Sequence, residues 1–369
     1  MPDLIAIDLP AGPAWVDLLR RAWDAGDAVL PVDQRLAPPA KRGVLTALGA
    51  GVVVDAGGRT TLPGGRPVEP GDALVMATSG TTGEPKGVVL THDAVVASAR
   101  ATAARLGVDP AVHRWLACLP LNHIGGMSVL TKALCTGSAL TVLPGFDAEA
   151  VLVASGPDVL VSLVPTALRR VGAAAFHTVV LGGSAPPAGL AANVHTTYGL
   201  TETGSGVVYD GRPLDGVDVA LDGADGQIRV RGPMLLRAYR DGRVPLDAGR
   251  WFATGDAGRW VDGRLVVDGR LSDLIVTGGE NVWPTPIERI LAAHPAVGEV
   301  AVAGRPDVEW GERVVAFVVP AAGSEPPTLD ALRGLVREQL AAFAAPRELV
   351  VVDALPKTAI GKVQRALLT

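Results

Sequence analysis

Apolar runs alternate with helical patterns along much of the chain, and no other sequence feature constrains its fold more. Short apolar runs typical of strands occur at residues 73–78, 115–119, 138–143, 159–163, 179–181 and 194–197. Patterns typical of helices lie among them at residues 91–105 and 127–134. This alternation predicts an α/β fold, in which helices cover a mostly parallel sheet. Ligands of such sheets bind beyond the carboxyl ends of the strands.

The pattern changes after residue 202. Short strands between Asp-Gly turns predict a small antiparallel β unit, with strands at residues 217–221, 227–231, 251–254 and 264–267. The chain beyond residue 270 is typical of a compact α+β module, with helices at 284–293 and 329–343 and strands at 298–302 and 314–319. We therefore expect a large N-terminal domain over residues 1–270 and a smaller C-terminal domain over residues 271–369.

Composition excludes several classes of protein. Hydrophobic residues make up 48% of the 369 residues, and the net charge of −5 argues against a nucleic-acid partner or a basic membrane-surface protein. The first residues lack the basic start and apolar core of a signal peptide, and the apolar stretch at residues 151–168 is interrupted well short of a bilayer span. The two cysteines, Cys118 and Cys135, indicate buried free thiols rather than a zinc site. We expect a cytoplasmic protein.

Residues 78–87, with the sequence TSGTTGEPKG, are predicted to connect a strand to a helix and to wrap phosphates. Glycines let backbone N–H groups approach a phosphate, hydroxyls donate further hydrogen bonds, and a lysine supplies positive charge. The candidate phosphate-binding residues are Thr78, Ser79, Gly80, Thr81, Thr82 and Lys86. The spacing differs from that of a Walker A loop, and composition alone leaves a polar surface turn as the alternative.

This segment and four later ones resemble, in order, the motifs of the ANL superfamily of acyl-CoA synthetases, adenylation domains and luciferases. The first resembles the superfamily's phosphate loop. The others are YGLTET (198–203), TGD (254–256), GRLSD (269–273) with the glycine turn GGEN (278–281), and PKTAIGK (356–362). The resemblance covers the chain from about residue 72 to its end. It implies an ATP-dependent acid–thiol ligase that forms an acyl-adenylate and then a thioester with coenzyme A.

The resemblance assigns adenine and magnesium binding to the second motif. Glu202 would hold Mg²⁺ through a hard carboxylate oxygen and is counted among the catalytic residues. Tyr198 would stack on adenine, with Gly199 and Thr201 beside it. From the residues alone, a core tyrosine and a glutamate in a surface ion pair are the alternatives.

The third and fourth motifs supply the predicted ribose contacts and the hinge. The Asp256 carboxylate can accept both ribose hydroxyls, with Arg270 assisting, although a simple turn and an ordinary salt bridge are the alternatives. Ser272 takes the hinge position of a mobile C-terminal domain, where many relatives carry Asp or Lys. Gly278 and Gly279 would then border the narrow tunnel for the pantetheine of coenzyme A.

Lys362 is the predicted catalytic lysine. By resemblance its ammonium bridges the substrate carboxylate and the α-phosphate, whereas from its position alone it is a solvated lysine near the chain end. No general base is needed, because the attacking carboxylate is ionised at neutral pH.

Three further segments are predicted to line the acyl pocket, namely LPLNHIGG (119–126), LVPT (163–166) and VLGGSAP (180–186). Together they resemble o-succinylbenzoate–CoA ligases of menaquinone biosynthesis. The candidate substrate-binding residues are His123, Thr166, Arg169, Arg170, Gly182, Gly183 and Ser184. His123 would flank the reacting carboxylate and is counted among the catalytic residues. Arg169 or Arg170 would neutralise a second carboxylate. A packed histidine and helix-surface arginines are the alternatives.

One departure from the superfamily pattern concerns the N-terminal region. In most relatives the phosphate loop comes later in the chain, so we expect a shortened N-terminal subdomain, as in actinobacterial forms. The sequence therefore leaves two points open, namely whether the pocket wall is complete and whether the protein forms a homodimer. A ligase for another aryl or short-chain acid, an enzyme that loads a carrier protein, and a non-catalytic nucleotide-binding protein are the alternatives to the o-succinylbenzoate prediction.

Overall fold

The computed structural model of the chain describes residues 1–79, 85–223, 225–357 and 363–368. The chain divides into two compact units, the first made of Met1–Val219 and Arg229–Ala253 and the second of Ala220–Ile228 and Thr254–Thr369. In the described part of the chain, no helix is long and apolar enough to cross a membrane.

The first unit contains a seven-stranded sheet in the order β16-β6-β5-β2-β1-β3-β4. Its strands are Leu4–Ile7 (β1), Ala28–Pro31 (β2), Val52–Asp55 (β3), Gly58–Thr61 (β4), Asp72–Ser79 (β5), Pro85–Thr91 (β6) and Ala238–Tyr239 (β16). β1 pairs in parallel with β2 and β3, and β2 pairs in parallel with β5. Sequence analysis predicted no strand before residue 73, and β1 to β4, with four residues each, were missed.

A second seven-stranded sheet has the order β13-β12-β11-β10-β9-β7-β8. Its strands are Arg114–Ala117 (β7), Ala139–Val142 (β8), Gly156–Leu163 (β9), Phe176–Leu181 (β10), Val194–Leu200 (β11), Ser205–Tyr209 (β12) and Arg212–Pro213 (β13). The neighbours β8, β7, β9, β10 and β11 all pair in parallel. The predicted α/β fold with a mostly parallel sheet is therefore confirmed.

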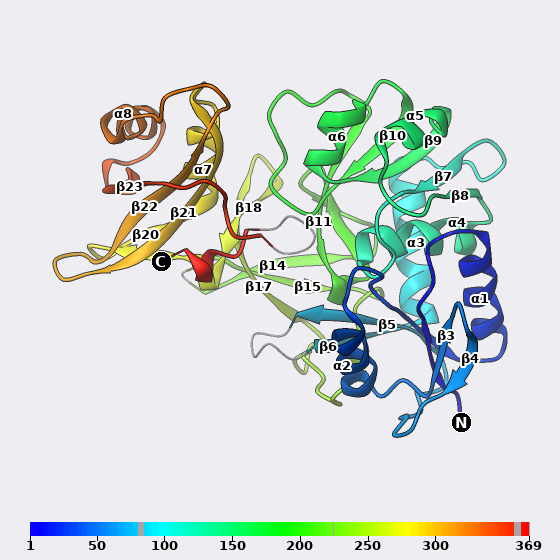
Figure 1. Cartoon of the computed structure of the whole chain (residues 1–369). Helices are drawn as coiled ribbons and strands as arrows, with labels where there is room; N and C mark the ends of the chain where they lie inside the picture. The colour runs from blue at the N-terminus through cyan, green and yellow to red at the C-terminus, as the bar shows by residue number, and fades with distance from the viewer. Residues whose placement is uncertain (80–84, 224, 358–362, 369) are drawn as a thin grey trace. The chain divides into compact units, whose positions relative to one another are not determined.

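Two long helices, α3 (His92–Leu106) and α4 (Ile124–Thr136), pack against each other beside these sheets (Figure 1). α3 contacts β5 and β6 of the first sheet and β12 of the second, while α4 contacts β7, β8 and β9. Thr91 caps α3, since its Oγ1 accepts a hydrogen bond from the N–H of Ala94 at 3.2 Å. The other helices of this unit are α1 (Pro13–Asp24), α2 (Pro38–Leu48), α5 (Ala148–Val153) and α6 (Pro165–Val171).

The prediction that residues 78–87 connect a strand to a helix is wrong. β5 and β6 are antiparallel neighbours, with Thr78 opposite Lys86 and Ser79 opposite Pro85. The buried run Val88, Val89 and Leu90 belongs to β6, which ends before α3 begins. Sequence reading missed this strand because its pairing with β5 and β16 is a tertiary property.

The predicted small β unit is a four-stranded sheet in the order β14-β15-β17-β18. Its strands are Asp218–Asp222 (β14), Gln227–Arg231 (β15), Phe252–Val261 (β17) and Arg264–Arg270 (β18). β17 and β18 pair antiparallel, as predicted, and they bring Asp256 opposite Arg270.

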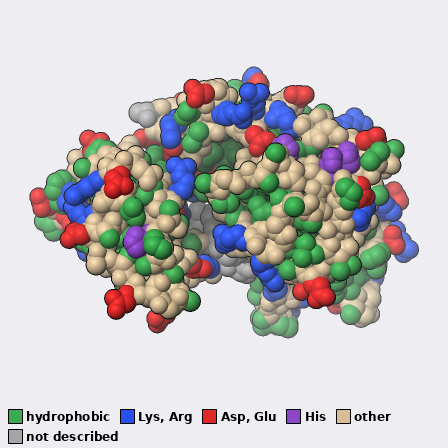
Figure 2. All heavy atoms as spheres, turned by 90° about the horizontal axis from the view of Figure 1, so that it is seen from above, with side chains coloured by type: hydrophobic (Ala, Val, Ile, Leu, Met, Phe, Trp, Pro, Cys, Tyr) green, Lys and Arg blue, Asp and Glu red, His purple; other side chains and the backbone are tan. Residues whose placement is uncertain are grey.

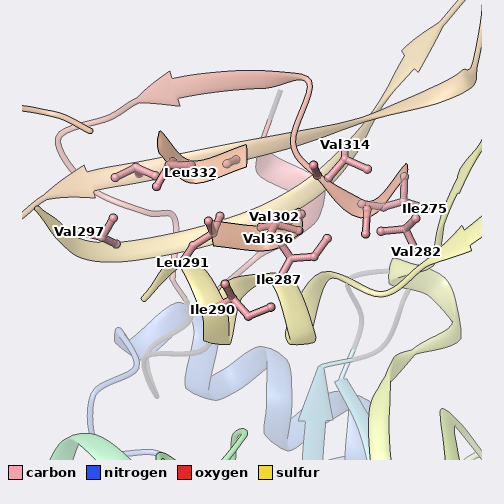
Figure 3. Packing of buried hydrophobic residues seen from close by; sticks show 14 residues of the cluster. Ile275, Val282, Ile287, Ile290, Leu291, Val297, Val302, Val314, Leu332 and Val336 are labelled. Atoms are coloured by element: carbon pink, nitrogen blue, oxygen red, sulfur yellow. The ribbon is translucent and has the colours of Figure 1, made fainter. Parts of the chain in front are cut away.

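The second unit contains the predicted α+β module. Its five-stranded sheet has the order β20-β19-β22-β21, with β23 on β22. The elements are Ile275–Thr277 (β19), Glu280–Val282 (β20), α7 (Pro284–Leu291), Val297–Asp307 (β21), Gly311–Pro320 (β22), α8 (Leu329–Gln339) and Glu348–Val351 (β23). Figure 3 shows apolar side chains of α7 and α8, such as Ile287 and Val336, packed against those of the sheet, such as Val302 and Val314.

Charged side chains of both signs are interspersed over the face shown in Figure 2. The whole chain carries 33 Lys and Arg against 38 Asp and Glu.

Candidate active site

The predicted substrate segments follow four parallel strands of the second sheet. His123 comes after β7, Thr166 after β9, Gly182 after β10 and Glu202 after β11. Because β7, β9, β10 and β11 are parallel neighbours, these segments lie along one edge of the sheet. The fold thus brings residues that are about 80 positions apart in the sequence to the edge where ligands of α/β sheets bind.

Part of the phosphate segment lies on the β5–β6 pair. The Thr78 hydroxyl donates a hydrogen bond to the Lys86 carbonyl at 3.3 Å, across the two strands. Lys86 is half-buried on β6, and its ammonium lies 5.8 Å from the centroid of the Tyr239 ring. Ser79 is the last residue of β5. The candidates Gly80, Thr81 and Thr82 lie outside the described residues.

Glu202 lies in a single 3-10 turn, Thr201–Thr203, directly after β11. The turn is held by Thr203, whose Oγ1 accepts the N–H of Leu200 at 2.8 Å. The Glu202 Oε1 accepts a hydrogen bond from the Tyr239 hydroxyl at 3.0 Å. Burial, followed by the charge of Glu202, raises the pKa of Tyr239, so this hydroxyl remains a donor at neutral pH.

The environment of Glu202 fits a magnesium ion that arrives with the nucleotide. Among the described residues, no group of three or more His, Cys, Asp or Glu side chains could hold a metal by itself. Mg²⁺ keeps several waters and binds through one or two carboxylates together with substrate phosphates. A single hydrogen-bonded carboxylate near a half-buried lysine suits that mode of binding.

Tyr198 and Gly199 lie on β11, at the irregular register with β12. A Cβ at Gly199 would lie 2.1 Å from the Ser205 carbonyl oxygen, so the position requires glycine for close packing of the two strands. This requirement holds whether or not adenine approaches the backbone. Tyr198 is half-buried, and its stacking role stays a prediction.

His123 precedes α4 and contacts a pair of residues that sequence analysis did not single out. Its Nε2 lies 3.2 Å from the Arg35 Nη2, and Arg35 is ion-paired with Asp33 at 2.8 Å. A guanidinium can only donate, so the His123 Nε2 accepts and the ring proton sits on Nδ1. Burial, followed by the charge of Arg35, lowers the pKa of His123. Asp33 and Arg35 lie between β2 and α2, where no sequence motif marks them.

Most of the remaining acyl-pocket candidates are exposed, and Gly182 is half-buried. Thr166, Arg169 and Arg170 are exposed on the short helix α6, and the Arg170 guanidinium lies 5.0 Å from the centroid of the Phe146 ring. This contact packs the Arg170 side chain against an aromatic ring. It favours the alternative that Arg170 is a helix-surface arginine.

The glycine segment after β10 has a local reason for its composition. Gly183 has a φ of 87°, and a Cβ at Gly182 would lie 2.7 Å from the Thr197 Oγ1. Ser184 follows and is exposed.

Within the second unit, Arg270 lies beside Asp256. The Arg270 Nε lies 3.0 Å from the Asp256 Oδ1, and its Nη1 donates to the Thr254 carbonyl at 2.9 Å. Asp256 is 7% exposed. The structure therefore holds the two predicted ribose-binding side chains together.

The hinge and tunnel candidates also belong to the second unit. Ser272 is exposed in a 3-10 turn, Leu271–Asp273. Gly278 and Gly279 have φ values of 60° and 83°, and a Cβ at Gly278 would lie 2.8 Å from the Trp310 ring. Positive φ thus already favours glycine at both positions. Lys362 lies outside the described residues.

Comparison with known proteins decides the family. The model of the AMP-binding enzyme family matches residues 59–240, and that of the AMP-binding enzyme C-terminal domain matches residues 286–362. A probable 2-succinylbenzoate–CoA ligase of Mycobacterium tuberculosis is 40% identical over 344 residues, covering 82% of this chain and 85% of that protein. The chain belongs to the AMP-binding enzyme family. The resemblance to the superfamily predicted from the sequence is therefore confirmed.

Other AMP-binding enzymes share this similarity. An indoleacetate–CoA ligase of Aromatoleum aromaticum is 36% identical, over 79% of this chain and 66% of that protein. The o-succinylbenzoate CoA synthetase of Bacillus subtilis, solved with its acyl-adenylate intermediate, is 27% identical with a TM-score of 0.86. It matches 100% of this chain and 88% of its own. The same synthetase has also been solved with ATP and a magnesium ion.

The two family matches contain most of the predicted site. Lys86, His123 and Glu202 fall within the first match, and Lys362 is the last residue of the second. The roles of the individual residues stay predictions.

Proposed function

We propose that this AMP-binding enzyme is an ATP-dependent ligase that converts o-succinylbenzoate to its coenzyme A thioester in menaquinone biosynthesis. The observation that carries the substrate is the 40% identity to a probable 2-succinylbenzoate–CoA ligase across 85% of that protein's length. The positioning of His123 and Glu202 at one sheet edge supports the same reaction.

The reaction has two steps. A carboxylate oxygen attacks the α-phosphorus of ATP and pyrophosphate leaves, which gives an acyl-adenylate. The thiol of coenzyme A then attacks the acyl carbon and AMP leaves. We assign Lys86 to the phosphates, Glu202 to the magnesium of MgATP, and Asp256 with Arg270 to the ribose. Magnesium supplies charge neutralisation at the polyphosphate.

We assign the neutral His123 to the reacting carboxylate. With Nε2 held by Arg35, its Nδ1–H is the group that can donate a hydrogen bond. The domain boundary at residue 270, a cytoplasmic location and a homodimeric state also stay predictions.

Removal of the predicted catalytic lysine tests the adenylation step. Lys362→Ala should lower acid-dependent pyrophosphate release by about 10²-fold or more, because one preorganised charge at the transferring phosphorus is lost. Binding of a fluorescent ATP analogue should change little. Lys357→Ala, five residues earlier, removes an ammonium ion-paired with Glu299 and is the matched control. Unchanged turnover of Lys362→Ala would refute the assigned role.

A panel of acids tests the substrate. Thioester formation should require ATP, Mg²⁺ and coenzyme A together and should be fastest with o-succinylbenzoate. Indoleacetate is the comparison acid, because a ligase named for it is 36% identical to this chain. Faster turnover of indoleacetate or of a short-chain acid would move the assignment to that class. An adenylate that forms but never reaches coenzyme A would indicate a carrier-protein-loading enzyme.

A further inference from the structure

Tyr239 lies between two parts of the proposed nucleotide site without belonging to any predicted motif. Its hydroxyl donates to the Glu202 Oε1 at 3.0 Å. Its ring lies near two cations, with the Arg243 guanidinium 5.3 Å and the Lys86 ammonium 5.8 Å from the ring centroid. The side chain is half-buried.

Strand pairing places Tyr239 there. β16 pairs antiparallel with β6, and Tyr239 stands opposite Val88. Lys86 precedes Val88 by two residues, and residues two apart on a strand point to the same face. The backbone N–H of Leu236 donates to the Glu202 carbonyl at 2.8 Å. This hydrogen bond links the segment just before β16 to the 3-10 turn that contains Glu202. The contact between the tyrosine and the glutamate is therefore built into the sheet.

We propose that Tyr239 is a positioning residue that orients the Glu202 carboxylate for the magnesium of MgATP. Its hydroxyl occupies Oε1 and limits rotation of the carboxylate, which leaves Oε2 to face the metal. Groups that hydrogen-bond to a metal-binding carboxylate fix its orientation, and their loss typically weakens metal binding 10- to 100-fold. This inference rests on the proposed function, because that function assigns the metal to Glu202.

The aromatic ring of Tyr239 has a second role, which concerns the Lys86 ammonium. Within the described residues, Lys86 and Glu202 form no ion pair with each other, and the lysine instead lies by the aromatic ring. A direct pair would occupy both charges that the polyphosphate and its metal need. Contact with the ring stabilises the ammonium without a direct pair to Glu202.

The test is Tyr239→Phe, which removes the hydroxyl and keeps the ring. We expect the half-saturating Mg²⁺ concentration for acid-dependent pyrophosphate release to rise about tenfold or more. The rate at saturating Mg²⁺ should stay within about twofold of the parent enzyme. In direct titrations of Mn²⁺ by electron paramagnetic resonance, with a non-hydrolysable ATP analogue present, metal binding should weaken by a similar factor.

Two controls distinguish positioning from a structural effect. Tyr209→Phe removes another tyrosine hydroxyl, which lies 3.3 Å from the Thr102 Oγ1, and should leave the metal midpoint unchanged. In a Glu202→Gln background, Tyr239→Phe should add no further shift, because the tyrosine acts through the glutamate. If the half-saturating metal concentration of Tyr239→Phe stays within twofold of the parent value in both assays, the proposal is overturned. If the parent enzyme releases no pyrophosphate with any acid, the proposed function fails, while the Mn²⁺ titration still tests Tyr239.

Discussion

At the scale of single residues, Lys132 on α4 is a buried lysine that the proposed reaction does not use. It is 2% exposed, its Nζ donates to the Ser128 Oγ at 3.2 Å, and its ammonium lies 5.7 Å from the centroid of the Trp115 ring. Burial lowers its pKa from 10.5 to about 8. The folded state therefore disfavours the charged lysine that the unfolded chain carries at neutral pH.

Lys132→Met should stabilise the protein at pH 7. The difference between the two pKa values corresponds to about 3 kcal/mol, which is an upper estimate of the gain in the free energy of unfolding. The folded pKa is the lower one, so the parent protein recovers this stability as the pH rises from about 8 to 10.5. Urea unfolding of both proteins at pH 7 and pH 10.5 measures the effect. The gap between their midpoints should close at the higher pH, and a gap that persists there would contradict the burial argument.

Single glycines show where sequence reasoning stopped short. Gly199 and Gly278 were predicted from the superfamily to make room for ligands. The structure gives each a local cause as well, a close strand contact at Gly199 and a positive φ beside Trp310 at Gly278. A sequence shows that glycine is present but not which neighbour requires it.

At the scale of elements, the start of β5 is tied to the segment that leads into β16. The Arg237 guanidinium makes two hydrogen bonds to Asp72, Nε to Oδ1 at 2.8 Å and Nη2 to Oδ2 at 2.9 Å. Asp72 is 1% exposed. This pair holds the edge strand that carries Tyr239.

Asp72→Asn should therefore destabilise the protein by about 2–3 kcal/mol, because the buried carboxylate that pairs with Arg237 is lost and only the exposed Glu69, 2.6 Å from the Arg237 Nη1, remains as its ion-pair partner. The shift of the thermal unfolding midpoint measures the loss. Asp218→Asn is the matched control, since Asp218 pairs with Arg231 at 2.8 Å while both side chains are largely exposed. Equal shifts in the two variants would show that burial of the pair contributes little.

Most elements after residue 72 could be predicted from their apolar periods, including β15 with its bounds. Two of the missed strands share one physical cause. β6 and the two-residue strand β16 exist through pairing with partners elsewhere in the chain, so their local sequence carries little signal. Tyr239 meets Glu202 through that same pairing, and for this reason the motifs identified Glu202 but not its hydrogen-bond donor.

At the scale of the whole molecule, the two half-reactions make different demands on the chain. The superfamily resemblance predicts that adenylation needs Lys362 at the phosphorus. It also predicts that thioester formation needs this lysine replaced by an entry route for the thiol. The superfamily resemblance predicts that residues after a hinge at Ser272 reorient between the two steps. The motif predicts the position of the hinge residue, whereas the energy of reorientation depends on contacts that no motif encodes.

Ser272→Pro should separate the two steps. Ser272 is exposed in the 3-10 turn Leu271–Asp273, where a proline fixes φ and disfavours the helical conformation of Leu271, the residue before it. We expect acid-dependent pyrophosphate release to stay within a few-fold of the parent rate and thioester formation to fall about tenfold or more. Ser272→Ala removes the hydroxyl, keeps φ free and should leave both rates unchanged. If proline lowers both half-reactions equally, the turn serves local stability, and the reorientation must occur about another residue.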